Sequence, residues 1–132
     1  MKFNFLFSVL KDGELCNMCT RPGTCTHTND EAQPWWKVTL TSSRAVSRVR
    51  LTSREDCCPE RLQNFDIYVG GEKCASGVSL GGGETKDVVL LNVVSGAACV
   101  GQEIKIQKTD TNVLTLCGFE AYGGLDGSRV SG

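Results

Sequence analysis

The chain has 132 residues, which is enough for one domain with a hydrophobic core. Its formal net charge of −1 offers no electrostatic basis for binding nucleic acid or an anionic membrane surface. No apolar stretch approaches the roughly 20 residues that a membrane-spanning helix needs. We therefore expect neither a nucleic-acid partner nor membrane insertion.

Eight cysteines are a high and even count for a chain of this length. Such counts favour disulfide bonds and an oxidising compartment, so we predict a secreted, extracellular protein. Residues 1–10 have the basic start and apolar stretch of a secretory signal, but Lys11-Asp12 follows at once and no small-residue cleavage site is present. We favour a strand or an ordinary chain start for these residues.

Several segments alternate apolar and polar residues with the period of two that is typical of half-buried strands. Their inward-facing residues are, in chain order, Trp36, Val38 and Leu40; Val49 and Leu51, with Arg48 and Arg50 on the opposite face; Phe65, Ile67 and Val69; Ile104 and Ile106; and Leu114, Leu116 and Phe119. Residues 88–94 are more continuously apolar and predict a strand buried on both faces. Of the adjacent Trp35 and Trp36, alternation assigns one ring to the core and the other to lateral packing.

Turn-forming residues separate these segments at 70–71, 81–83, 95–96 and 110–112. Six or seven short strands with regular turns, and no helical stripe, predict an all-β fold: an antiparallel β-sandwich or jelly roll. We divide the chain into an uncertain N-terminal segment (1–11), one domain (12–123) and a small, polar, flexible tail (124–132).

Polar chemistry concentrates at His27 and in the segment 54–61, which reads Arg-Glu-Asp-Cys-Cys-Pro-Glu-Arg. An arginine presents five donors in a rigid fork that can bind two neighbouring oxygens, and a histidine can serve a third. Asp56 lies between Arg54 and Arg61 and could hold their guanidinium groups in place. This combination suits the hydroxyl groups of a neutral sugar, although each residue alone would more often be an ordinary surface group.

The adjacent cysteines Cys57 and Cys58 allow three interpretations. They could bond to each other and form a rigid apolar plate beside a sugar ring, bond to two different partners, or stay reduced. The other six cysteines can pair among themselves, so the count permits a vicinal disulfide without requiring it.

The spacing of these residues is specific. His27, 26 residues, Arg54-x-Asp56, four residues and Arg61 together resemble the motif of the F-type lectins, the fucolectin family. Residues 23–27, 34–38, 116–117 and 122–123 and the Cys-Cys pair are also similar to that family, so the resemblance runs from about residue 12 to residue 123.

The resemblance implies a jelly-roll lectin that binds terminal α-L-fucose on glycans. It implies that His27, Arg54 and Arg61 hydrogen-bond the sugar, that a Cys57–Cys58 disulfide packs on its apolar face, and that Asp56 orients the arginines. It also implies the pairings Cys25–Cys117 and Cys74–Cys99. By analogy with the family, recognition of microbial glycans, as in innate immunity, or of gamete surface glycans would fit such a module. A single site of this kind binds weakly, so a homo-oligomer would add avidity.

The family also binds a structural calcium ion, and the corresponding residues here are Asp12, Glu14, Thr24 and Cys117. Glycine replaces the family's acidic residue after Cys117, so few of the six to eight oxygen ligands of calcium come from side chains and we expect weaker affinity. The N-terminal part is shorter than in the family, and residues 3–9 could substitute for a missing edge strand.

Other interpretations remain open. Cys16, Cys19, Cys25 and His27 could form a cramped zinc site, although a Cys16–Cys19 disulfide or pairing between chains fits the spacing better. A discoidin-like module with a protein or lipid partner, and a truncated, weakly binding lectin fragment, are the alternative functions.

Enzyme chemistry has little support. The chain has one histidine, and no paired-carboxylate or phosphate-loop motif stands out. Asp56 and Glu60 each have an adjacent arginine, which lowers a carboxyl pKa, whereas the general acid of a glycosidase needs a raised pKa. We expect a binding protein and not an enzyme.

Overall fold

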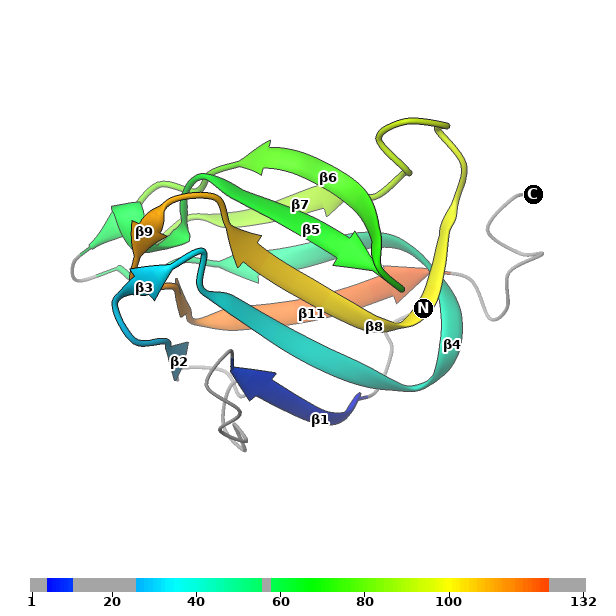
Figure 1. Cartoon of the computed structure of the whole chain (residues 1–132), viewed down its shortest axis with the longest axis horizontal. Coiled ribbons are helices and arrows are strands. Elements are labelled where there is room, and N and C mark those ends of the chain that lie inside the picture. Colours follow the sequence, from blue (N-terminus) through cyan, green and yellow to red (C-terminus); the bar gives the residue numbers. More distant parts are fainter. Residues whose placement is uncertain (1–4, 11–25, 56–57, 124–132) are drawn as a thin grey trace.

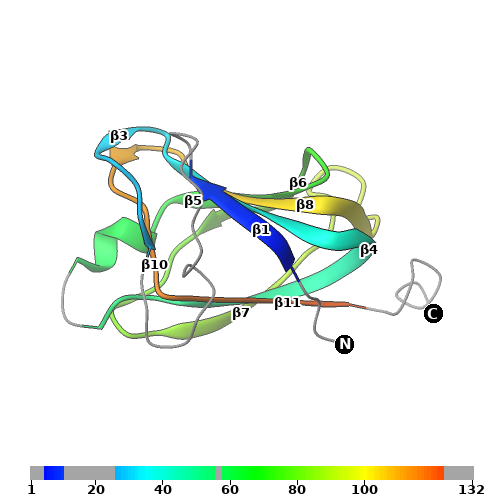
Figure 2. The same ribbon diagram turned by 90° about the horizontal axis from the view of Figure 1, so that it is seen from below.

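Two layers of antiparallel strands form this protein, as Figures 1 and 2 show. The structure, a computed structural model, describes residues 5–10, 26–55 and 58–123. Every strand pairing among these residues is antiparallel, which confirms the predicted all-β sandwich. No helix in the described part of the chain is long and apolar enough to span a membrane.

The described elements are eleven strands and one short 3₁₀ helix. They are β1 (Phe5–Leu10), β2 (Thr26–His27), β3 (Glu31–Ala32), β4 (Trp35–Thr52), η1 (Pro59–Leu62), β5 (Phe65–Val69), β6 (Glu72–Val78), β7 (Thr85–Val89), β8 (Cys99–Lys108), β9 (Thr111–Asn112), β10 (Thr115–Leu116) and β11 (Gly118–Gly123).

Strand β4 belongs to both layers. Its first half pairs with β1 and β8, in the layer ordered β1-β4-β8-β5-β6, and its second half pairs with β11 and β7 in the smaller layer. The register of β4 against β8 shifts between Thr39 and Arg44, where the strand bends around the end of the sandwich. A strand that changes layer at such an irregularity makes the corner of a sandwich without ending its hydrogen bonding.

The core lies between the layers and is centred on Trp36. This side chain is fully buried, and its ring meets the edge of Phe119 from the smaller layer at a centroid distance of 4.7 Å. Trp35 is only partly buried, as alternation predicts. The other inward-facing residues predicted from the sequence are buried as well: Val38, Leu40, Val49, Leu51, Phe65, Ile67, Val69, Ile104, Ile106, Leu114 and Leu116.

The outer face of the smaller layer carries the predicted pair Arg48 and Arg50. Asp87 of β7 accepts hydrogen bonds from both guanidinium groups, at 3.1 Å from Arg48 and 2.8 Å from Arg50. The bond from Arg50 lowers the pKa of Asp87 and raises that of Arg50. Arg48 also stacks over the ring of Tyr122 at 4.1 Å. Both arginines are therefore engaged by neighbouring side chains on the surface of the sheet.

The prediction of a doubly buried strand at residues 88–94 is wrong. Strand β7 ends at Val89, which is 70% exposed, and the chain continues as a loop in which Val94 is 93% exposed. Leu90 is buried, but its neighbours in the loop face outward. The physical reason is position: in the described part of the chain β7 pairs with β4 at the edge of the smaller layer, and most of its residues are exposed, so continuous apolar character does not place the segment between two sheets.

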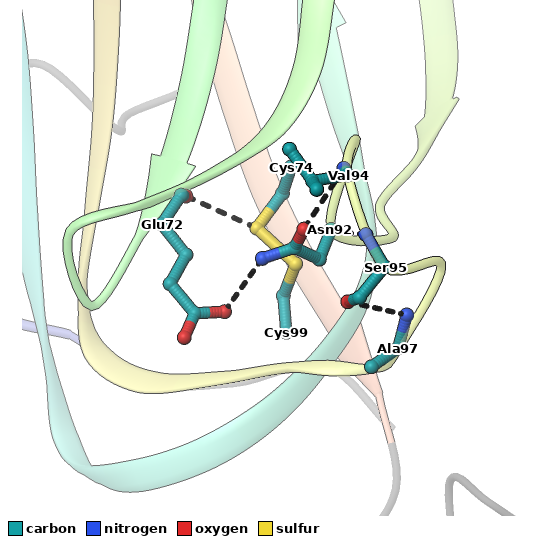
Figure 3. Close-up of a disulfide and its surroundings, with 7 residues drawn as sticks. All are labelled: Glu72, Cys74, Asn92, Val94, Ser95, Ala97 and Cys99. Carbon is teal, nitrogen blue, oxygen red and sulfur yellow. Dashed lines mark hydrogen bonds between the residues drawn. A yellow bond between two sulfur atoms is a disulfide. The ribbon is translucent and has the colours of Figure 1, made fainter.

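A disulfide between Cys74 and Cys99 ties β6 to the start of β8 and confirms the predicted pairing. Figure 3 shows the loop that it closes. The side chain of Asn92 donates to Glu72 at 3.0 Å and accepts from the backbone N–H of Val94 at 2.9 Å. The side chain of Asn92 therefore defines a turn in this loop, and the apolar residue Val94 lies exposed at that turn.

Strand β1 takes the edge position that the sequence predicted for residues 3–9. It pairs with the first half of β4, with Leu10 opposite Trp36. The larger layer thus gains an edge strand from the N-terminal part of the chain.

We predict that Trp36→Ala lowers the free energy of unfolding by about 3–5 kcal/mol, because a large ring between the layers is replaced by a cavity. Urea denaturation followed by far-ultraviolet circular dichroism measures the change. The matched control is Trp35→Ala, which removes the same ring from a partly exposed position. An equal effect of the two substitutions would contradict the assignment of Trp36 to the core.

Candidate functional site

Three segments that carry predicted site residues meet at one end of the sandwich. They are β2 with His27, the residues after β4 with Arg54, and η1 with Arg61. Strand β10 connects them, because it pairs with β2 and also contacts η1. Residues 34 positions apart in the sequence are thereby brought to the same end of the fold (Figure 2).

The position of His27 is set by a short antiparallel pair. His27 lies opposite Thr115 of β10. The next residue, Thr28, is buried and exchanges two hydrogen bonds with Leu114: its N–H donates to the Leu114 carbonyl at 3.0 Å, and its hydroxyl accepts from the Leu114 N–H at 2.9 Å. The hydroxyl also donates to the Asn29 carbonyl. The short pairing of β2 with β10 is thus extended by one further pair, Thr28 with Leu114, in which a side-chain hydroxyl replaces a backbone acceptor.

Arg54 follows the end of β4 and is partly buried. The buried Ser53 donates its N–H to the Glu84 carbonyl at 2.9 Å, and the Arg54 carbonyl accepts from Gly83 at 3.0 Å. Gly83 has a φ of +73° and packs against Glu55. The turn at 81–84 therefore fixes the backbone from which the Arg54 side chain projects.

Helix η1 presents Arg61 from a tightly constrained turn. Cys58 precedes the helix with a left-handed φ of 65°, and the Arg61 N–H donates to its carbonyl at 3.0 Å. Leu62 is buried and its carbonyl accepts from Leu80, so the helix is pinned to the core on one side. Arg61 is partly buried, and no described residue accepts a hydrogen bond from its guanidinium.

A buried lysine that sequence reasoning missed lies under this helix. Lys108 is fully buried, and its ammonium donates to the carbonyls of Glu60, at 2.8 Å, and Gln63. Burial lowers the pKa of Lys108 from its ordinary value of 10.5, and the Asp110 carboxylate 3.4 Å away opposes that shift. A signal was present: Lys108 has the same parity as Ile104 and Ile106, whose side chains point inward.

Several predicted residues lie outside the described residues. They are Asp12, Glu14 and Thr24 of the calcium prediction, Asp56 and Cys57 of the sugar site, and Cys16, Cys19 and Cys25. Cys58 is disulfide-bonded, which excludes a reduced thiol at that position, and the vicinal pairing with Cys57 stays a prediction. The described part of the chain contains no cluster of three or more histidine, cysteine or acidic residues that could hold a metal ion.

Cys117 is also disulfide-bonded, and its N–H donates to the carbonyl of Thr52 at 2.9 Å. The predicted partner Cys25 lies outside the described residues, so the Cys25–Cys117 pairing stays a prediction.

The residue after Cys117 bears on the calcium prediction. A Cβ added to Gly118 would lie 3.0 Å from both the Cβ and the Oγ1 of Thr52. A side chain at this position would require the Thr52 side chain to move by a few tenths of an ångström, so the acidic ligand that the resemblance implies there would meet a tight contact.

Comparison with known proteins identifies the scaffold. A model of the NedA-like, galactose-binding domain family matches residues 11–112. The chain belongs to this family. The resemblance to F-type lectins is also confirmed by sequence: Fucolectin-6 of Anguilla japonica is 31% identical over 104 residues, which cover 74% of this chain and 53% of the relative. The chain spans about half the length of the curated relatives that it matches.

Solved structures agree. The fucolectin from striped bass (Morone saxatilis) serum superposes with a TM-score of 0.67 at 28% identity, covering 76% of this chain and 36% of that one. A fucose-binding module of Streptococcus pneumoniae superposes with a TM-score of 0.59 at 26% identity, covering 76% of this chain and 70% of that one. These superpositions agree with the family that the sequence shows, so the site end described above lies in a domain with the fold of the F-type lectins.

We predict that Thr28→Val lowers the free energy of unfolding by about 1–3 kcal/mol, because the buried N–H of Leu114 loses its acceptor. Thermal or urea denaturation measures the loss. Thr109→Val is the control: its hydroxyl donates to the Asn64 carbonyl at an exposed position, where water can replace it. Equal losses in the two variants would show that the Thr28 hydroxyl does not lock β2.

Proposed function

We propose that this domain is a lectin that binds glycans ending in α-L-fucose. The observation that carries the proposal is the meeting of Arg54, Arg61 and the strand of His27 at one end of the sandwich, with the disulfide-bonded Cys58 beside Arg61. The spacing of the same residues resembles the fucolectin motif, and named relatives are fucolectins.

Binding would follow from the chemistry of the two kinds of surface. The arginine forks would donate to neighbouring sugar oxygens and His27 would serve a third, with Asp56 holding the guanidinium groups in place. Arg61 is suited to this role because no described residue occupies its guanidinium. A Cys57–Cys58 disulfide would contact the apolar face of the ring.

The methyl group of L-fucose would contribute to its preference over D-galactose, which also differs from it in absolute configuration. The carbon C6 of fucose is a methyl group, whereas galactose carries a hydroxymethyl group there. An apolar plate rewards contact with a methyl group and leaves a buried hydroxyl without a partner, which costs about 1–3 kcal/mol. We therefore propose fucose, although the family model is described as galactose-binding.

The proposed activity is recognition without covalent chemistry, in an extracellular setting that the disulfides favour. Recognition of microbial surface glycans in innate immunity is consistent with such a lectin. Calcium binding through Asp12, Glu14, Thr24 and the Cys117 region stays part of the proposal, with low affinity expected because Gly118 supplies no carboxylate.

We predict that L-fucose raises the melting temperature of the protein, since a ligand that binds only the folded state stabilises it. Arg61→Ala should weaken fucose binding at least tenfold, because charge-assisted hydrogen bonds to the sugar are lost. Isothermal titration calorimetry with L-fucose and D-galactose measures both affinity and choice of sugar.

The matched control for this experiment is Arg44→Ala, which removes the same side chain where β4 pairs with Gly101, away from the site end. It should bind fucose like the parent protein. Unchanged fucose binding by Arg61→Ala would refute the assigned site, and a parent protein that prefers galactose would refute the proposed sugar.

A second surface favours the predicted homo-oligomer. The loop closed by the Cys74–Cys99 disulfide exposes Leu91, Val93 and Val94 and lies at the end of the sandwich opposite η1 (Figures 1 and 3). We propose that it contacts a second copy of this chain. Weak single sites gain strength when several act together, and pairing through this loop would leave both sugar sites facing outward.

We predict that Val94→Asp shifts the protein towards the monomer, because a carboxylate would be desolvated in the contact. Sedimentation velocity over a range of protein concentrations measures the change. Asn29→Asp adds the same charge at an exposed position near the sugar end and should leave the oligomer unchanged. A parent protein that is monomeric at all concentrations would contradict this surface.

A further inference from the structure

The buried Lys108 reaches the sugar-site helix from below. Its ammonium bonds the carbonyl oxygens of Glu60 and Gln63, which are the residues on either side of Arg61 and Leu62. A lysine is rarely fully buried unless it is paired, because an ammonium loses its hydration there. Lys108 therefore has a cost in this fold that a conventional apolar core residue would not have.

The other contacts that hold η1 are made largely by Leu62, whose side chain is buried and whose carbonyl accepts from Leu80. The helix has four residues, and the hydrogen bond from the Arg61 N–H to the Cys58 carbonyl closes one turn of it. A helix terminus leaves carbonyl groups without partners, and a cation near the C-terminal end satisfies them and complements the helix dipole. The Lys108 ammonium occupies this place and fixes both ends of the segment Glu60–Gln63 at once.

The other side of Lys108 is rigid. Its backbone N–H donates to the Pro34 carbonyl at 3.0 Å, next to the start of β4. Asp110 lies 3.4 Å from the ammonium and accepts from the Asn64 amide at 3.2 Å. The ammonium is thus held between the larger layer and the loop that follows η1. A displacement of the helix would therefore break the hydrogen bonds from Lys108 to the carbonyls of Glu60 and Gln63.

We propose that Lys108 is a positioning residue of the sugar site: through the carbonyls of Glu60 and Gln63 it sets the orientation from which Arg61 meets its ligand. The proposal rests on the proposed function for the ligand, but the positioning of η1 can be tested without any sugar. Lys108 does not itself touch the sugar.

The central variant is Lys108→Met, which keeps the length and apolar stem of the side chain and removes its donors. We expect fucose affinity to fall about tenfold at a temperature where the variant is fully folded, since two carbonyls lose their partner and the helix loosens. The control is Lys105→Met on the same strand, whose ammonium lies over Tyr68, 4.9 Å from its ring, and not under η1. It should keep parent affinity.

A second readout separates positioning from general stability. In native-state hydrogen exchange, we expect the amides of Arg61 and Leu62 to exchange at least tenfold faster in Lys108→Met, while those of β5 change little. Uniform acceleration in both segments, or parent-like fucose affinity in a folded Lys108→Met variant, would overturn the proposal.

Asp110→Asn covers the case in which Lys108→Met does not fold. It leaves the ammonium without its carboxylate and should speed exchange at Arg61 and Leu62 with a smaller loss of affinity, about threefold. Parent-like exchange and affinity in this variant would count against the positioning role. If the parent protein binds no fucose, the proposed function fails, and the exchange of the η1 amides in these variants still decides whether Lys108 positions the helix.

Discussion

The continuity of β4 is the constraint on which the rest of the structure depends. One strand of 18 residues pairs with β1 and β8 in one layer, and with β11 and β7 in the other. Because the strand bends at one end of the sandwich and returns, both its start and its finish lie at the opposite end. The carbonyl of Pro34, just before its first residue, accepts a hydrogen bond from the N–H of Lys108, and Arg54 lies two residues after its last residue, Thr52. The residues of the candidate site therefore lie at the end of the sandwich where β4 both begins and ends.

Both ends of the sandwich contain disulfide-bonded cysteines, namely Cys58 and Cys117 at the site end and Cys74 with Cys99 at the other. At the site end, short strand pairs, a buried hydroxyl and a buried ammonium also satisfy the backbone. At the other end, the disulfide and the side chain of Asn92 hold a single loop. The buried polar bonds preserve a specific geometry around the site, whereas the loop at the other end exposes apolar side chains.

The sequence predicted the strands whose apolar residues alternate, because period two reports directly which face is buried. The spacing of His27, Arg54 and Arg61 also indicated one shared site, and the segments that carry them lie at the same end of the sandwich. It failed at residues 88–94, where a continuous apolar run cannot reveal whether a strand lies inside a sheet or at its edge. Lys108 was missed because a charged residue is normally assigned to the surface, although its parity matched that of Ile106. Its bonds to Glu60 and Gln63 depend on three-dimensional closure and have no local pattern.

The separation of Lys108 from its partners also has a consequence for the order of folding. Its hydrogen bond to Glu60 joins residues 48 positions apart in the chain, whereas η1 itself depends on neighbours three positions apart. Contacts of long sequence separation require loop closure first and tend to form late. The packing of Trp36 against Phe119 joins residues still further apart in the chain, so the closed core and the bond to η1 depend on the same long-range closure. The placement of Arg61 is therefore coupled to assembly of the whole sandwich.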